Sequence, residues 1–262
     1  MLVALLRHDR ALVLWGLIAV ITLAWAWLLL GAGVGMDEMD MGGGQIMMMA
    51  PAWTPGYAAL VVIMWVVMMA AMMLPSAAPA ILLVAALMRQ RGDGRQLRAS
   101  WVFACGYLAV WFGFSLMAAV LQWGLDQAGL LSDTMVSGSV VLAGLLLIAA
   151  GIYQWTPWKQ ACLRQCRSPF ELLTRYWRQG ALGPAWAGVR HGAYCLGCCW
   201  MLMAVLVAFG TMQLWWMAAL AALILFEKVS SFGERVAHVA GIVFVLIGAV
   251  LLLHPTTISY LI

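Results

Sequence analysis

Residues 56–88 read GYAALVVIMWVVMMAAMMLPSAAPAILLVAALM, and this uncharged run decides the fold. About 20 apolar residues in a helix cross the ~30 Å hydrocarbon layer of a bilayer, so the run is long enough to cross it and continue. It contains Pro75 and Pro79, and a proline inside a helix removes a backbone donor and clashes with the preceding turn. The run therefore predicts a transmembrane helix that is broken at its prolines.

The rest of the chain has the same apolar character. Of its 262 residues, 66% are hydrophobic and 9% are charged, whereas soluble domains carry about 25% charged residues. In a bilayer, by contrast, a helix satisfies its own backbone groups. Further apolar runs occupy residues 11–32, 99–123, 135–155, 192–211, 213–226 and 236–253. We therefore expect an all-α membrane protein, a polytopic bundle of six or seven transmembrane helices forming a single integral membrane domain over residues 1–262.

The positive charges predict the orientation of this bundle. All 14 lysines and arginines fall before the first run or within residues 89–98, 159–190 and 228–235, segments that share one side of the predicted layout. Cytosolic loops carry the excess of lysine and arginine, so we expect a cytosolic N-terminus in a bacterial-type inner membrane. Residues 34–55 then form an outside loop and residues 156–190 a cytosolic loop. Within the latter, 168–180 has the spacing of an amphipathic helix, which is either a membrane-surface helix or a plain connector.

Methionine is concentrated in one part of the chain. Eleven of the 19 methionines lie between residues 36 and 73. In the outside loop, Met36, Met39 and Met41 alternate with acidic residues. Thioethers are soft ligands that select Cu(I), so this segment predicts copper capture. The alternative is a loop whose methionines rest on the membrane surface.

A second group of methionines lies on the predicted second helix. Because Met64, Met68 and Met72 are four residues apart, as are Met69 and Met73, they form two rows on neighbouring faces. The rows indicate either adaptable packing or a ladder of thioether ligands.

The six cysteines all fall at or near the predicted cytosolic side, where the compartment is reducing and structural disulfides are not expected. His191, Cys195, Cys198 and Cys199 share one helical face, and Cys162 and Cys166 are one helical turn apart. Thiolates at such spacing bind Cu(I), zinc or an iron–sulfur cluster. The alternative is that the cysteines are small apolar side chains of the core, an explanation that suits Cys105 well. His191 is either a fourth ligand or a cap at the helix end.

An acidic and a basic residue, Glu227 and Lys228, end the short run 213–226. Ionisable groups at membrane depth are functional candidates. At a helix end, however, such side chains can also reach the interface, and the pair would then be interfacial.

At these motifs the chain resembles a family of predicted metal-binding integral membrane proteins that is named for a domain of unknown function. The resemblance rests on WVVMMAAMMLPSAAP (65–79), YQWTPWKQACLRQCRSP (153–169), GAYCLGCCWMLM (192–203) and the Glu227–Lys228 pair. It implies a role as metal ligands for the residues that match the double-Met and cysteine motifs: Met68, Met69, Met72, Met73, Cys162, Cys166, Cys195, Cys198 and Cys199. It implies neither a particular metal nor a reaction.

Together these patterns favour copper handling in the membrane, for import, sensing or delivery to another membrane protein or a periplasmic metal carrier. A membrane oxidoreductase and an assembly subunit of a larger complex are the alternatives. Copper is the expected metal, with zinc or an iron–sulfur cluster as alternatives. The sequence contains no phosphate-binding loop, Ser/His/Asp set or zinc-protease motif, which disfavours ATP-driven pumping and hydrolysis. The sequence predicts the lipid bilayer as a partner and predicts no nucleic-acid partner.

Overall fold

The computed structural model describes residues 2–31, 37–40, 46–49, 52–90, 96–129, 140–176, 180, 182–209 and 213–253. Helices make up nearly all of this part of the chain. Its elements are α1 (Leu2–Leu29), β1 (Asp37–Asp40), β2 (Ile46–Met49), α2 (Pro55–Gln90), α3 (Gln96–Gln127), α4 (Val140–Gln154), α5 (Pro157–Arg167), α6 (Pro169–Tyr176), α7 (Gly183–Phe209), α8 (Leu214–Val229) and α9 (Gly233–Leu253).

Five helices, α1, α2, α3, α7 and α9, are long and apolar enough to cross a membrane. A sixth crossing results if α4 and α5 count as one span, although the pair is bent by 64° at the break between them. The run 213–226 becomes α8, which has 16 residues and is shorter than the ~20 residues of a full crossing. The fold is therefore the helical, membrane-compatible bundle that the sequence predicts, but the described residues hold five or six candidate spans where the sequence analysis expects six or seven.

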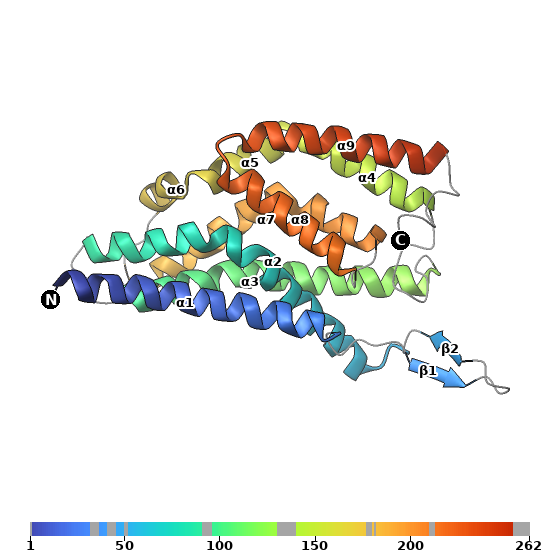
Figure 1. Ribbon diagram of the computed structural model, residues 1–262, viewed down its shortest axis with the longest axis horizontal. Helices are drawn as coiled ribbons and strands as arrows, with labels where there is room; N and C mark the ends of the chain where they lie inside the picture. The colour runs from blue at the N-terminus through green and yellow to red at the C-terminus, as the bar shows by residue number, and fades with distance from the viewer. Residues whose placement is uncertain are drawn as a thin grey trace.

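Helix α2 differs from the prediction of a broken helix. It continues through Pro75 and Pro79 as one helix of 36 residues. The two prolines remove the N–H groups that would bond the carbonyls of Ala71 and Pro75, and Figure 1 shows α2 changing direction part-way along its length. The prolines thus bend the helix without interrupting it.

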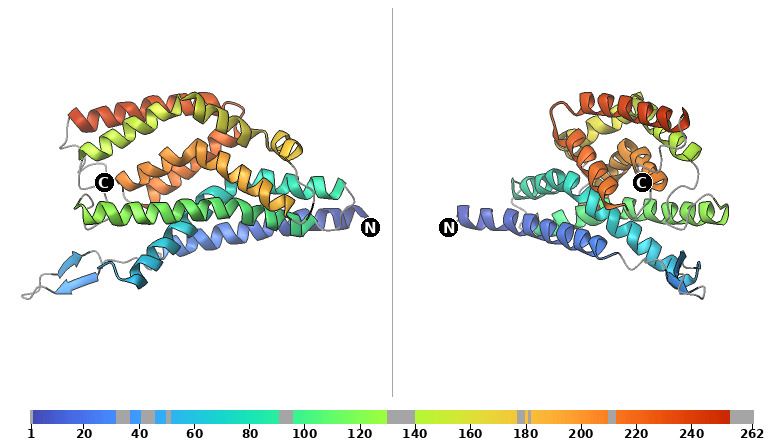
Figure 2. Two further views of the ribbon diagram at one scale, coloured as in Figure 1. Left: turned by 180° about the vertical axis from the view of Figure 1, so that it is seen from behind. Right: turned by 45° about the vertical axis from the view of Figure 1, so that its right-hand side comes forward.

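The bundle has two tightly packed parts. Helix α3 packs against both α2 and α7, while α4 packs against α9, and Figures 1 and 2 show the α4–α9 pair lying along one side of the molecule. Glycines permit this close approach: a methyl group on Gly151 would lie 2.6 Å from the carbonyl oxygen of Gly241, and one on Gly248 would lie 2.7 Å from that of Gly144. Small residues at helix contacts are the usual means of close packing in membranes.

Several cations that the sequence analysis assigned to loops lie inside helices. Lys159 and Lys228 are buried in α5 and α8, and Arg190 lies within α7 because that helix begins at Gly183. The remaining layout is consistent with Figure 1, where the N-terminus and α6 lie toward one end of the molecule and the β1–β2 hairpin lies at the other.

The segment 156–190 contains two helices, α5 and α6, that pack on the bundle. Helix α5 contacts α7, and α6 contacts α2 and α7. Leu163 and Leu173 are buried, whereas Trp158 and Phe170 are exposed, so protein covers part of the apolar surface of each helix.

The Met-rich segment contains a short hairpin that the sequence analysis does not predict. β1 and β2 pair antiparallel, with Met39 opposite Met47 and Glu38 opposite Met48. Met36 and Met41 lie outside the described residues. Of the three loop candidates, the structure therefore places Met39 alone, at a register position in the hairpin.

Candidate functional site

Three cysteines on α7 form the centre of the site. Cys195, Cys198 and Cys199 are all buried, with exposed fractions of 1%, 2% and 1%. The thiols of Cys198 and Cys199 lie 3.1 and 2.8 Å from the carbonyl oxygen of Cys195, to which they donate. Because α7 extends from Gly183 to Phe209, the three residues lie near its middle. This corrects the expectation that they lie at the cytosolic end of a helix beginning at residue 192.

Helix α5 contributes two further cysteines. The Cys166 thiol is buried and lies next to the side chains of Cys195 and Cys198. Cys162, one turn earlier, is less buried and lies over Gly197, where a methyl group would be 2.8 Å from its sulfur. The bend between α4 and α5 therefore brings the second cysteine motif against the first.

From the methionine ladder, Met73 reaches the thiols. Its Sδ lies 4.0 Å from the Sγ of Cys199. The other four ladder residues, Met64, Met68, Met69 and Met72, are buried in the core, as Met73 is. We call Met73, Cys166, Cys195, Cys198 and Cys199 the sulfur cluster. Met73 lies close to the middle of α2, as the cysteines do in α7.

A lysine and a tyrosine border the cluster. The Nζ of Lys228 donates to the Sγ of Cys195 at 2.8 Å and to the Oγ of Ser76 at 3.2 Å. The hydroxyl of Tyr107 lies 3.0 Å from the same Sγ and donates to the carbonyl oxygen of Met73 at 3.2 Å. Cys195 is thus the sulfur with polar partners from two other helices, α3 and α8.

His191 is buried next to the cluster without joining it. Its ring packs against the rings of Phe103 and Tyr107, with centroid separations of 5.8 and 5.7 Å. Its Nδ1 has no hydrogen-bond partner among the described residues. A ligand role for His191 would therefore require its ring to move toward the thiols.

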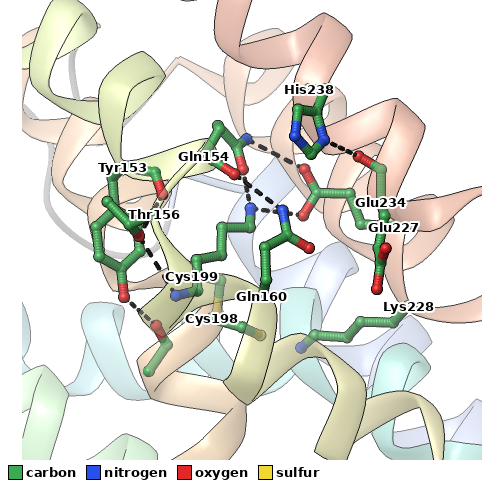
Figure 3. A network of polar contacts seen from close by, with 12 residues as sticks. Tyr153, Gln154, Thr156, Gln160, Cys198, Cys199, Glu227, Lys228, Glu234 and His238 are labelled. Carbon is green, nitrogen blue, oxygen red and sulfur yellow. Dashed lines mark hydrogen bonds and ion pairs between the residues drawn. The ribbon is translucent and has the colours of Figure 1, made fainter.

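A second buried polar site lies beside the first. The Nζ of Lys159 is 2.7 Å from the Oε2 of Glu227, and Gln154 bonds to both of these side chains. Lys159 and Glu227 are 0% and 2% exposed. Figure 3 shows this network at the α4–α5 bend, with the side chain of Lys228 extending separately toward the cysteines. Neighbouring Glu227 and Lys228 therefore have different partners and do not form the interfacial pair that the sequence analysis left open.

A cavity of about 620 Å³ borders this region at Lys228. Residues of α5, α6 and α8 line it, among them Arg164, Arg167, Glu171 and Lys228. Because Lys228 also contacts Cys195, its side chain both lines the cavity and borders the sulfur cluster.

The thiols do not already have the arrangement of a metal site. Among the described residues, no group of three or more His, Cys, Asp or Glu side chains is placed to hold a metal ion. The donor set nevertheless suits a soft ion. Two sulfur ligands of one ion, each about 2.3 Å from it, lie at most ~4.6 Å apart, and the Met73–Cys199 separation of 4.0 Å is within that limit.

A family model described as PpoB2, copper chaperone, matches residues 62–251. The chain belongs to the PpoB2 family. The matched region of this PpoB2 family member contains the whole sulfur cluster, Lys159, Glu227 and Lys228, and it begins after the β1–β2 hairpin. The motifs behind the sequence resemblance, from residue 65 to residue 228, also fall within it. Neither a curated protein nor a solved structure matches the chain.

The sequence analysis missed Ser76, Tyr107 and Lys159. Lys159 was counted only as a topology charge, yet it lies within the motif 153–169 that the resemblance includes, three residues before Cys162. Ser76 stands between the two prolines of α2 and follows the Met73 turn. For Lys159 and Ser76, the available signal was a polar residue inside one of the motifs. Nothing in the sequence pattern singles out Tyr107.

Proposed function

We propose that this protein is a membrane copper chaperone that holds Cu(I) at the sulfur cluster. One observation carries the proposal: buried cysteine sulfurs from α5 and α7 meet a methionine sulfur from α2, with 4.0 Å between Met73 Sδ and Cys199 Sγ. Thiolate and thioether are the ligands that select Cu(I), and Cu(I) accepts low coordination numbers. The description of the PpoB2 family as copper chaperone supports this assignment.

Burial suits transfer of a reactive ion. The cysteines of α7 are at most 2% exposed, so bound Cu(I) is kept from water and oxidants. The cavity lined by Arg164, Arg167 and Lys228 supplies a route between the cluster and the surface. The recipient in this proposal is another membrane protein or a soluble metal carrier that reaches the cavity or the hairpin side.

The proposed orientation has the N-terminus in the cytosol of a bacterial-type cell, with the hairpin outside. The lysines and arginines of the helix ends support it through the positive-inside rule. In a Cys105→Ser background, Asp40→Cys should react with an impermeant thiol reagent added to intact cells, and Arg98→Cys should not. Labelling of Arg98→Cys from outside would overturn the orientation.

Metal titration of the reduced, purified chain tests the copper site. Cu(I) added against a colourimetric chelator should bind without visible colour of its own. The double variant Cys195→Ser, Cys199→Ser keeps side-chain size but removes two soft ligands. Its affinity should fall by more than the roughly 10–100-fold that loss of an outer-shell partner costs.

Cys105→Ser is the matched control, because Cys105 lies on α3 and is exposed, which corrects the expectation that it is a core side chain. Its affinity should equal that of the unchanged chain. Equal Cu(I) binding by the double variant would refute the site. Haem, flavin or iron–sulfur absorption in the purified protein would instead favour the oxidoreductase alternative.

A further inference from the structure

The buried charges around the cluster do not balance. Lys159 and Lys228 contribute two ammonium groups, and Glu227 contributes one carboxylate, which pairs with Lys159 at 2.7 Å. In the part of the chain that the structure describes, Lys228 has no carboxylate partner; its Nζ bonds instead to Cys195 Sγ and Ser76 Oγ. Charges buried away from water require compensation by an opposite charge, so the anion that matches Lys228 has to come from the cluster.

The charge of a bound metal depends on the ion. A monovalent ion held by two thiolates forms a complex with one negative charge, whereas a divalent ion held by two thiolates forms a neutral complex. A third thiolate would change this count, but no three described side chains of the Cys, His, Asp and Glu types are arranged around a common point. We therefore take two thiolates, assisted by the uncharged sulfur of Met73, as the ligand set.

Lys228 lies close enough to the cluster for its charge to distinguish a monovalent complex from a divalent one. Its Nζ is 2.8 Å from the Sγ of Cys195, and it is 8% exposed. With a monovalent ion, the anionic complex and the ammonium together are neutral. With a divalent ion, the neutral complex no longer offers the ammonium an anion on its buried side, where Ser76 is the other partner, and this is less favourable. The fixed positive charge therefore penalises the divalent complex.

We propose that Lys228 makes the sulfur cluster selective for monovalent soft ions, Cu(I) and Ag(I), over divalent ions such as Zn(II). Lys228 is a specificity-determining residue and not a ligand. The inference rests on the proposed function, since it requires that the cluster bind metal. The sulfurs select metal ions by softness, and Lys228 in addition selects them by charge.

Competition titrations on the full chain in lipid nanodiscs test this role. Ag(I) and Zn(II) affinities are measured under reducing conditions for the unchanged chain, Lys228→Met and Lys228→Gln. The ratio of Ag(I) to Zn(II) affinity should fall about 10–100-fold in both neutral variants, the range for an outer-shell partner of a metal site. Two neutral side chains of different polarity are used so that a folding defect in one does not prevent the measurement.

Two further variants complete the test. Lys228→Arg keeps the charge and should keep most of the selectivity, which loss of packing alone would not explain. Arg235→Met removes an exposed cation that lies over the Phe232 ring at the start of α9, and the ratio should stay unchanged.

An unchanged ratio in Lys228→Met and Lys228→Gln, with Ag(I) still bound, would overturn the role of Lys228. Failure of the unchanged chain to bind Ag(I), or Ag(I) binding that survives the double variant Cys195→Ser, Cys199→Ser, would instead overturn the proposed function. The two failures are thus separate results of the same titrations.

Discussion

The two buried lysines differ in their partners, although they lie close together in the structure. The Lys159 ammonium has an ion-pair partner, the Glu227 carboxylate at 2.7 Å, and Gln154 hydrogen bonds to both side chains. Lys228, the residue that follows Glu227, instead donates to a thiol sulfur and a serine hydroxyl. A buried ion pair that is fully hydrogen bonded fixes structure, while a buried charge without a carboxylate marks a site for something else to bind. The contrast assigns a structural role to the first lysine and a functional one to the second.

The largest effect is expected at the structural site. Glu227→Gln keeps the shape of the side chain but leaves the Lys159 ammonium buried without its anion. Breaking a buried pair in this way costs about 3–5 kcal/mol. Unfolding in mixed micelles should show a loss of that size, whereas Glu234→Gln, exposed in the first turn of α9, should stay within about 0.5 kcal/mol of the unchanged chain.

Removal of both partners sharpens the same point. Replacing a buried pair with apolar residues is often neutral, so Lys159→Met combined with Glu227→Leu should lose clearly less stability than Glu227→Gln. A double variant at least as unstable as the single one would mean that the charges stabilise α8 beyond their mutual attraction. The comparison between the lysines would then no longer separate structure from function.

The smallest effect concerns two methionines of the same helix. Met→Leu conserves volume and usually costs less than about 1.5 kcal/mol, so both Met73→Leu and Met64→Leu should fold. Met73 is 4.0 Å from Cys199, and its replacement should weaken Cu(I) binding several-fold, because leucine supplies no soft donor. Met64→Leu should bind as the unchanged chain does. Equal affinities in the two variants would show that Met73, too, is packing.

The sequence was sufficient where local pattern determines structure. The uncharged run of α2 predicted its helix, since bilayer and backbone leave few alternatives. The spacing of Cys195, Cys198 and Cys199 predicted a shared face, since helical periodicity sets it. The prolines of α2 were read too strongly, because a helix packed among neighbours tolerates lost backbone bonds.

The sequence was insufficient where a contact joins distant segments. Lys228 and Cys195 are on different helices, and no local pattern specifies that α8 presents its lysine to α7. Similarly, the burial of Lys159 depends on the 64° bend between α4 and α5, which places it against Glu227. Tertiary packing decides both contacts, and a single sequence gives periodicity but not the pairing of helix faces.

The position of the cluster has an electrical consequence. Met73 lies near the middle of α2 and Cys195 near the middle of α7, so in the proposed membrane arrangement, where both helices cross the bilayer, the sulfurs would lie near mid-depth. One elementary charge that traverses a membrane gains or loses about 2.3 kcal/mol per 100 mV. A monovalent ion that reaches the cluster from either face traverses about half of that field, on the order of 1 kcal/mol at 100 mV, or several-fold in apparent affinity. In the proposed arrangement, an energised membrane would therefore make loading from one face easier than loading from the other.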